Sequence, residues 1–210
     1  MMMRKVLVTQ RISENSDYPE MRENLDIQWS KFLKSTGAIS VPISVNIDLK
    51  YYFNSFDISG IVLTGGNDLF NFSKNLSSKI RDKFEKKLIK KALQKNIPII
   101  GVCRGMQLIA QHFDMEVCMI KNHVGKNHNI QFTNITKNFS RFPKNPLVNS
   151  FHNFGVKKIK KNFKTIATAS DGSIEAFEHK NKSIIGIMWH PERYKVFKTY
   201  DQFLFKTFWK

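Results

Sequence analysis

The sequence predicts an α/β protein with a parallel sheet and helices on both of its faces. In the first half of the chain, short apolar runs alternate with longer stretches whose apolar residues recur every three or four positions. This is the pattern of alternating strands and amphipathic helices. The second half carries several short strand-like runs in succession, which favours an antiparallel addition to that sheet. With 210 residues and no strong linker, the chain is expected to form a single domain over residues 1–210.

The expected strands of the first half are short and apolar. They cover residues 5–9, 38–43, 57–63 and 97–100. Pro42 cannot donate a ladder hydrogen bond, so the second strand is expected at an edge or an end of the sheet. In open α/β sheets, ligands bind beyond the carboxyl ends of the strands. The polar segment 10–19 follows the first strand and is expected to be a loop there, so its Arg11 and Tyr18 are candidate binding residues.

Apolar residues at helical spacing predict the helices between these strands. One helical face consists of Met21, Leu25, Trp29 and Phe32, and a second consists of Ile80, Phe84, Leu88 and Ala92. Gly37 is expected to end the first helix, since glycine readily adopts the left-handed conformation of a helix C-terminus. The aromatic segment 51–56 is expected to pack in or under the core, and residues 195–209 are expected to form a closing helix.

Strands dominate the expected structure after residue 114. They cover residues 115–120, 130–132, 165–169, 173–177 and 183–189. A polar loop is expected at 123–128, and Asp171-Gly172 is typical of a turn between strands. Cys118, within the first of these runs, is expected to be a buried structural thiol.

The chain is strongly basic. It contains 34 Lys and Arg residues against 17 Asp and Glu residues, which gives a formal net charge of +17. Such a balance suits nucleic acid, a membrane surface or a small anionic ligand, and a biased genome composition would also produce it. The lysines are spread along the chain, with one dense cluster at residues 157–164. We therefore expect an anionic small-molecule substrate and no nucleic-acid partner.

Cysteine usage and the lengths of the apolar runs indicate the compartment. The 2 cysteines are too few for a disulfide framework and fit a reducing environment. The apolar run after Lys5 is short and is followed by Arg11 and Glu14, unlike a signal peptide. The apolar stretches are too short to span a bilayer. These features predict a cytoplasmic protein with no membrane partner.

Residues 99–107, with the sequence IIGVCRGMQ, have the form of a nucleophile elbow. In an elbow, a strand runs through a sharp turn into a helix and exposes the nucleophile at the turn. Gly101 and Gly105 provide the room that the close approach of the two backbones requires. Cys103 then lies at the amino end of the helix that starts near Arg104, whose dipole favours a thiolate. The alternative is a buried structural cysteine between two incidental glycines.

The segment His190-Pro191-Glu192 follows the last expected strand and supplies a base and a carboxylate. Proline favours an extended backbone in the residue before it. In an extended segment the side chains of residues i and i+2 point the same way, so Glu192 is expected to orient His190. With Cys103 as the nucleophile, these residues complete the logic of a catalytic triad. Alternatively, the segment is a strand end with a solvated glutamate.

A glycine pair, Gly65-Gly66, directly follows the expected strand 57–63. Glycine permits backbone geometries that aim amide groups at an anion, as an oxyanion hole requires. An ordinary glycine turn would have the same sequence. The histidines show no spacing typical of a metal site, so neither a metal nor a cofactor is expected.

The three segments together resemble the motifs of the class I glutamine amidotransferase-like family, which uses a Cys-His-Glu triad. They are Leu63-Thr64-Gly65-Gly66, Gly101-Val102-Cys103-Arg104-Gly105-Met106-Gln107 and Trp189-His190-Pro191-Glu192, in the order found in the family. The resemblance covers nearly the whole chain. It implies a three-layer αβα sandwich of the flavodoxin-like kind with a mostly parallel central sheet.

The resemblance also implies roles for individual residues. Cys103 would be the nucleophile, His190 the general base and then acid, and Glu192 the residue that orients His190. The amides of Gly66 and Arg104 would form the oxyanion hole. The implied substrate contacts are Gln107, Asn149, Ser150, Phe151 and His152. Asn153 departs from the pattern, because relatives often carry a second histidine at this place.

The likeness is greater to the γ-glutamyl hydrolase branch of the family. Arg104 follows the nucleophile, where amidotransferase domains more often carry leucine, and residues 171–176 resemble those of the hydrolases. The reaction implied is hydrolysis of a γ-glutamyl amide through a thioester, with release of L-glutamate. An anionic leaving group is expected because several basic residues follow the strands: Arg11, Arg22, Lys74 and Arg104.

The segment 10–26, which contains Arg11 and Tyr18, is similar to hydrolases of γ-glutamyl-CDP-amidate. Those enzymes release cytidine diphosphoramidate for capsule decoration. Folate polyglutamates are an alternative substrate. Two further hypotheses are a glutaminase subunit that delivers ammonia to a separate synthetase, and a non-catalytic module that binds an anion.

Overall fold

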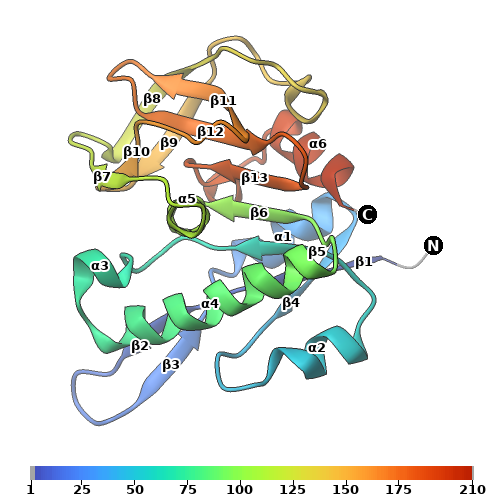
Figure 1. Ribbon diagram of the computed structural model, residues 1–210, viewed down its shortest axis with the longest axis vertical. Helices are drawn as coiled ribbons and strands as arrows, with labels where there is room; N and C mark the ends of the chain where they lie inside the picture. Colours follow the sequence, from blue (N-terminus) through green and yellow to red (C-terminus); the bar gives the residue numbers. More distant parts are fainter. Residues whose placement is uncertain (1–2, 210) are drawn as a thin grey trace.

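One large sheet runs through the molecule (Figure 1). The computed structural model describes residues 3–209. The strands lie in the order β4-β1-β5-β6-β13-β12-β11-β8-β9, and β10 and β7 extend the sheet beside β12. Because the chain order and the sheet order differ, residues far apart in the sequence meet along the edge of this sheet.

The first part of the sheet is parallel. It consists of β4 (Ala38–Pro42), β1 (Arg4–Val8), β5 (Ile58–Leu63), β6 (Ile99–Val102) and β13 (Ile184–Ile187). Every residue of β6 and β13 is buried, as expected where helices cover both faces of a parallel sheet. Pro42 ends the edge strand β4, as predicted.

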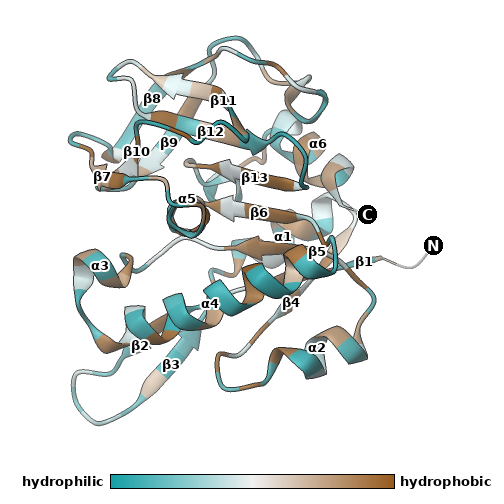
Figure 2. Cartoon of the chain, viewed as in Figure 1, coloured by the Kyte–Doolittle hydropathy of each residue, from teal (hydrophilic) through white to brown (hydrophobic). Residues whose placement is uncertain are grey.

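Helices cover both faces of the parallel strands, which confirms the predicted three-layer αβα arrangement (Figure 1). On one face lie α4 (Leu76–Gln94) and α5 (Arg104–His112), preceded by the short α3 (Phe70–Ser73). On the other lie α1 (Gln28–Ser35) and α6 (Thr199–Phe208), whose Phe32 and Phe205 rings meet edge to face at 4.8 Å. Brown and teal alternate along α4 in Figure 2, because one side of this helix packs on the sheet and the other meets solvent.

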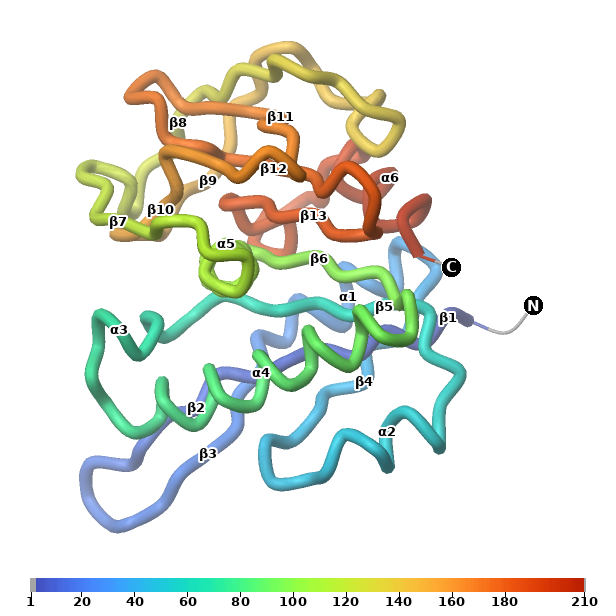
Figure 3. The backbone as a smooth tube through the Cα atoms, viewed as in Figure 1, coloured from blue at the N-terminus to red at the C-terminus, as the bar shows by residue number. Residues whose placement is uncertain are grey.

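The second part of the sheet is antiparallel, as predicted, and forms the yellow-to-red end of the molecule in Figure 3. Its strands are β7 (Val117–Met119), β8 (Val124–Phe132), β9 (Leu147–Phe151), β10 (Phe154–Val156), β11 (Phe163–Ala169) and β12 (Ile174–His179). The short helical turn η1 (Lys137–Phe139) follows β8. The prediction of a loop at 123–128 is wrong from residue 124 onward, because that segment pairs with β9.

The largest error of the sequence prediction lies between β1 and α1. The segment expected to be a loop and the start of a helix is a hairpin of β2 (Arg11–Glu14) and β3 (Met21–Asn24). Met21 is 44% exposed, so it does not extend the buried face of α1. The hairpin is attached to the rest of the fold by Asn67, whose Oδ1 accepts a hydrogen bond from the Ile12 amide at 3.2 Å.

Two smaller expectations also need correction. The aromatic segment 51–56 lies in α2 (Leu49–Ser55), whose residues are all at least partly exposed, although Tyr52 and Phe53 pack against the core. Cys118 is only partly buried.

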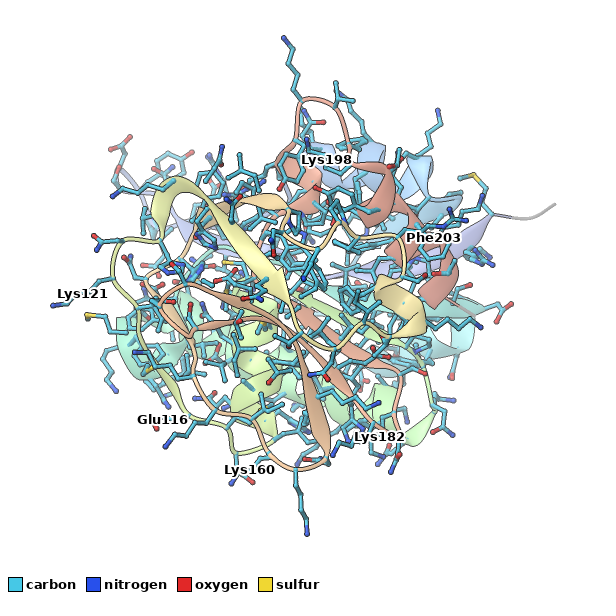
Figure 4. The ribbon with its side chains drawn as sticks, turned by 90° about the horizontal axis from the view of Figure 1, so that it is seen from above. Glu116, Lys121, Lys160, Lys182, Lys198 and Phe203 are labelled. Atoms are coloured by element: carbon cyan, nitrogen blue, oxygen red, sulfur yellow. The ribbon has the colours of Figure 1, made fainter. Side chains whose placement is uncertain are left out.

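The lysines are distributed over the surface. Figure 4 shows Lys121, Lys160, Lys182 and Lys198 extending from different sides of the molecule. In the basic cluster 157–164 the lysines are exposed, and Phe163 is buried between them. None of the helices within residues 3–209 is both long and apolar enough to cross a membrane.

Candidate active site

Three adjacent parallel strands bring the predicted catalytic segments to one edge of the sheet. β6 lies between β5 and β13. Cys103 directly follows β6, the glycine pair of residues 65–66 follows β5, and His190 follows β13. The topology therefore places the cysteine in the middle, with the glycine loop on one side and the histidine on the other.

Cys103 occupies the strained turn that a nucleophile elbow requires. Its φ of 53° and ψ of −107° lie outside the conformations that L-residues readily adopt. A Cβ added to Gly101 would lie 2.6 Å from the backbone of Gly105, and one added to Gly105 would lie 2.1 Å from the Leu63 carbonyl oxygen. Gly101 thus permits the strand and helix of the elbow to approach this closely, as the sequence predicted, whereas Gly105 permits the helix to approach the neighbouring strand β5.

His190 and Glu192 form a buried pair. Nδ1 of His190 lies 2.6 Å from Oε1 of Glu192, and each residue is 1% exposed. The prediction of an extended segment is wrong, because residues Pro191–Arg193 form the 3₁₀ turn η2. This turn, rather than the alternation of a strand, brings the carboxylate back to the ring of His190.

The imidazole of His190 also faces Cys103. A Cβ placed on Gly65 would lie 2.5 Å from His190 Cε1 and 3.4 Å from Cys103 Cβ, so both side chains border the same small space. Burial disfavours the charged imidazole, but Glu192 and Cys103 outweigh burial and raise the pKa of His190 to about 9. The ring is therefore protonated at neutral pH and can pair with a thiolate.

The backbone of His190 is held by Asn149. The Asn149 side chain accepts a hydrogen bond from the His190 amide at 2.8 Å and donates one to its carbonyl oxygen at 2.9 Å. Ser150, the next residue of β9, is 1% exposed and donates through Oγ to the His123 carbonyl oxygen. The side chains of Asn149 and Ser150 are thus used inside the protein, which leaves only their backbone for the predicted contact with substrate.

The glycine loop is fixed from behind by Arg81, a fully buried residue of α4. Its guanidinium donates to the carbonyl oxygens of residues 64–66, at 2.8, 3.1 and 2.5 Å respectively. A trans peptide points its C=O and N–H in opposite directions. Because the Gly65 carbonyl is turned toward Arg81, the Gly66 amide points away from it. Gly66 itself has a φ of 77° and borders the same cavity as Cys103.

Arg81 belongs to a buried group of four charged side chains, which we call the arginine cluster: Arg81, Asp82, Glu85 and Arg104. The guanidinium of Arg104 donates to Asp82 and Glu85, and Arg81 donates to Glu85 at 2.9 Å. Arg104 is 1% exposed. Its side chain is therefore not the anion-binding group that its place after the strand suggested, and only its backbone amide is available beside Cys103.

Two cavities meet at the glycine loop. One, of about 270 Å³, is lined by Gly66 and Cys103 together with Gln107, Phe151 and His152. The other, of about 290 Å³, is lined by Gly65 together with other residues that include Arg11, Trp29, Glu192 and Arg193. The nucleophile thus borders one cavity, and two arginines border the next.

The family model of Peptidase C26 matches residues 6–192. The chain belongs to the Peptidase C26 family. It is 39% identical over 189 residues to the γ-glutamyl-CDP-amidate hydrolase of Campylobacter jejuni, covering 89% of this chain and 88% of the relative. It is 29% identical to one of the subunits of the glutamine-hydrolysing GMP synthase of Methanocaldococcus jannaschii, over 76% and 78% of the two chains.

The fold of this Peptidase C26 protein is also found in a solved glutamine amidotransferase from Thermotoga maritima. The TM-score is 0.68 at 19% identity, and the match covers 91% of this chain and 77% of that structure. These comparisons confirm the predicted resemblance to class I glutamine amidotransferase-like proteins and the predicted fold class.

The remaining predicted contacts of the Peptidase C26 protein divide into two groups. Gln107, Phe151 and His152 line the cavity of Cys103, and the Phe151 ring meets the His190 ring at 5.7 Å. Tyr18 lies at the end of the β2–β3 hairpin, where it is 51% exposed and accepts a hydrogen bond from Arg22 at 2.9 Å. The structure therefore does not bring Tyr18 to either of the two cavities.

Sequence reasoning missed two features of this Peptidase C26 site. The first is Arg81; its spacing of four residues from Glu85 on a buried helix face was the available indication of an ion pair. The second is a group of side chains behind the cavity wall, which we call the histidine cluster: His123, His128, His152 and Glu175. Its members come from separate segments of the antiparallel part, so no spacing within a single motif indicates them.

Proposed function

We propose that this Peptidase C26 protein is a γ-glutamyl hydrolase that releases L-glutamate through a thioester on Cys103. The observation that carries the proposal is the elbow of Cys103 beside the buried His190–Glu192 pair. The 39% identity to the Campylobacter jejuni hydrolase supports γ-glutamyl-CDP-amidate as the substrate. We further propose a cytoplasmic reaction that supplies cytidine diphosphoramidate for capsule modification.

The first half of the reaction forms the thioester. The Cys103 thiolate attacks the γ-carbonyl carbon, and the amides of Gly66 and Arg104 bind the developing oxyanion. An oxyanion donor of this kind contributes about 3 kcal/mol in comparable enzymes. Protonated His190 gives its proton to the leaving nitrogen, and the C–N bond breaks. The protonated nitrogen leaves as the NH2 group of cytidine diphosphoramidate.

The second half hydrolyses the thioester. Neutral His190 takes a proton from a water molecule, whose oxygen attacks the thioester carbonyl carbon. The C–S bond then breaks, glutamate leaves, and the thiolate and protonated His190 are restored. Glu192 stabilises the charged imidazole, and Asn149 holds the His190 backbone in place. Gln107, Phe151 and His152 would form the wall against which the glutamyl part lies, because they line the cavity of Cys103.

The leaving group would occupy the neighbouring cavity. Arg11 and Arg193 line it, and the Arg193 guanidinium also lies 4.8 Å from the centre of the Phe151 ring. Two guanidinium groups suit a diphosphate, since arginine recognises phosphate oxygens in a bidentate manner. A glutaminase subunit that serves a separate synthetase is the second candidate, favoured by the similarity to the GMP synthase subunit of Methanocaldococcus jannaschii.

Glutamate release from γ-glutamyl-CDP-amidate and from glutamine tests the proposal. We expect rapid release from the CDP conjugate, and Cys103→Ala should lower kcat by at least about 10⁴-fold, as loss of a nucleophile does in comparable enzymes. Cys118→Ala is the matched control and should keep its activity. Release from glutamine alone would favour the glutaminase subunit. Conjugate hydrolysis that survives Cys103→Ala would overturn the mechanism.

A further inference from the structure

The histidine cluster lies behind the cavity of Cys103, where the antiparallel strands converge. Glu175 is at the start of β12 and is 0% exposed. His123 precedes β8, His128 lies in β8, and His152 follows β9. His123 and His152 are 6% and 3% exposed. Two strand segments, β8 with the residue before it and the end of β9, thus direct three imidazoles at one buried carboxylate.

The polar atoms at the centre of this cluster have no hydrogen-bond partner among residues 3–209. They are both carboxylate oxygens of Glu175, Nδ1 of His123, Nε2 of His128 and Nε2 of His152. Native proteins satisfy nearly all buried polar atoms, and a buried carboxylate left unpaired is strongly disfavoured. Such a concentration of unpaired donors and acceptors indicates a group that binds between them.

The hydrogen-bond partners of the His152 and His123 rings indicate what kind of group binds between these atoms. Nδ1 of His152 lies 3.0 Å from the carbonyl oxygen of Phe154, which can only accept, so Nδ1 carries the proton. In the neutral ring, Nε2 then presents a lone pair to Oε1 of Glu175 at 3.6 Å. His123 repeats the arrangement, with Nε2 facing Asp171 at 3.3 Å and Nδ1 facing Glu175 at 3.5 Å.

A nitrogen lone pair that faces a carboxylate oxygen is repelled by it unless a proton or a metal ion lies between them. The separations of 3.5 and 3.6 Å are too long for good hydrogen bonds. These two separations are close to the edge of a tetrahedron, because zinc bonds of about 2.0–2.1 Å place neighbouring ligand atoms roughly 3.4 Å apart. The three ligand atoms as a set lie within 4.8 Å, so zinc binding would draw the two imidazoles closer together. Imidazole and carboxylate are ligands that zinc accepts, and outer partners such as Asp171 are usual for zinc-bound histidines.

We propose that His123, His152 and Glu175 bind a zinc ion. One ligand atom from each can be chosen so that all three lie within 4.8 Å of one another. His128 Nε2 lies 3.5 Å from the second oxygen of Glu175 and is the side chain available for a fourth position. The ion joins the start of β8, the end of β9 and β12. Its role is structural, since it holds His152 in the wall of the Cys103 cavity.

Zinc binding by the Cys103→Ala variant tests this proposal without any turnover. The variant is used because the thiol beside His190 would itself compete for zinc. After treatment with a chelator, zinc is titrated in competition with a chromophoric chelator. We expect one equivalent to bind, and cobalt at the same site should give the visible absorption of tetrahedral Co²⁺.

Added substitutions assign the zinc to the cluster. Glu175→Gln should weaken binding at least 100-fold, while Asp171→Asn, which alters only an outer partner, should weaken it about tenfold. His112→Gln is the matched control, because His112 lies on α5 outside the cluster. Circular dichroism verifies the fold of each variant; if Glu175→Gln does not fold, His152→Gln replaces it.

Two outcomes would overturn the proposal. One is that the Cys103→Ala protein takes up no zinc above a protein-free blank. The other is that zinc binds equally well after folded Glu175→Gln or His152→Gln substitution, which would mean that the ion sits elsewhere. Neither outcome bears on glutamate release by the unaltered enzyme, so this proposal and the proposed function can fail separately.

Discussion

Two buried ionic groups border the catalytic edge of the sheet, and they differ in how their buried carboxylate oxygens are satisfied. In the arginine cluster every carboxylate oxygen accepts a hydrogen bond. Glu85 receives one from each arginine, and Asp82 receives one from Arg104 and one from the Phe70 amide. In the histidine cluster neither oxygen of Glu175 accepts one from the part of the chain that the structure describes.

The difference between the two clusters follows from the chemistry of guanidinium and imidazole. A guanidinium is always charged and has several donors in a fixed plane, so two arginines neutralise two carboxylates from within the chain. An imidazole is neutral near physiological pH unless its surroundings favour the charge. In the neutral form, one of its two nitrogens carries a lone pair. The arginine cluster therefore holds the glycine loop without any ligand, whereas the histidine cluster needs a cation from outside.

Breaking the arginine cluster should have the largest effect on stability. Arg81→Met leaves Oε1 of Glu85 and the carbonyl oxygens of residues 64–66 without their donor. Removal of one partner from a buried ion pair costs about 3–5 kcal/mol, and we expect this loss in the free energy of unfolding measured by urea denaturation. Lys83→Met, an exposed change on the same helix, is the control. A loss below about 1 kcal/mol would show that the cluster is not needed for stability.

The histidine cluster should show the complementary behaviour, namely stability that depends on zinc. In the Cys103→Ala protein, zinc at about 100 times its dissociation constant should raise the free energy of unfolding by about 2.7 kcal/mol. The measurement is urea denaturation with zinc and with excess chelator. Adding Glu175→Gln should abolish the difference, and Arg81→Met should leave it intact. An equal response to zinc in the Glu175→Gln protein would remove the contrast between the two clusters.

The contrast also explains which parts of the site could be predicted from the sequence. Three parts of the site each consist of neighbouring residues in the sequence, and each follows a strand with a clear apolar pattern. They are the elbow of Cys103, the glycine pair and the His190–Glu192 pair. Their meeting then follows from the parallel order of β5, β6 and β13. Local sequence and one topological rule are sufficient for these elements.

The parts that could not be predicted depend on pairing between distant segments. Asn149 binds the backbone of His190, which lies 41 residues further along the chain. The strand register that places Asn149 opposite Asn127 cannot be read from the sequence of either strand alone. The same register brings His128 and His152 toward Glu175. The β2–β3 hairpin was missed because its strands are short and largely exposed, so they lack the buried alternation that marks a strand.

The buried His190–Glu192 pair is a third ionic group, and unlike the two clusters its contribution to stability should depend on pH. The pKa of His190 is raised to about 9 in the folded protein, above the ordinary value of 6.5. The stabilisation is therefore complete below pH 6.5 and is lost as the pH rises through 9. Between pH 7 and pH 9 the loss should be about 2 kcal/mol in the free energy of unfolding. Glu192→Gln removes the partner and should flatten this pH dependence; an unchanged slope would contradict the assigned pair.

The smallest effect is expected where the same ionic chemistry lies in solvent. Arg22 pairs with Glu20 near the end of the β2–β3 hairpin, and their side chains are 53% and 39% exposed. Water screens such a pair, and ordering two long side chains offsets most of the attraction. We therefore expect Arg22→Gln to leave the urea midpoint unchanged within error at physiological salt, and glutamate release to stay within about twofold of the parent, because surface changes away from a site are near neutral. A marked fall in release would mean that the end of the β2–β3 hairpin takes part in substrate binding.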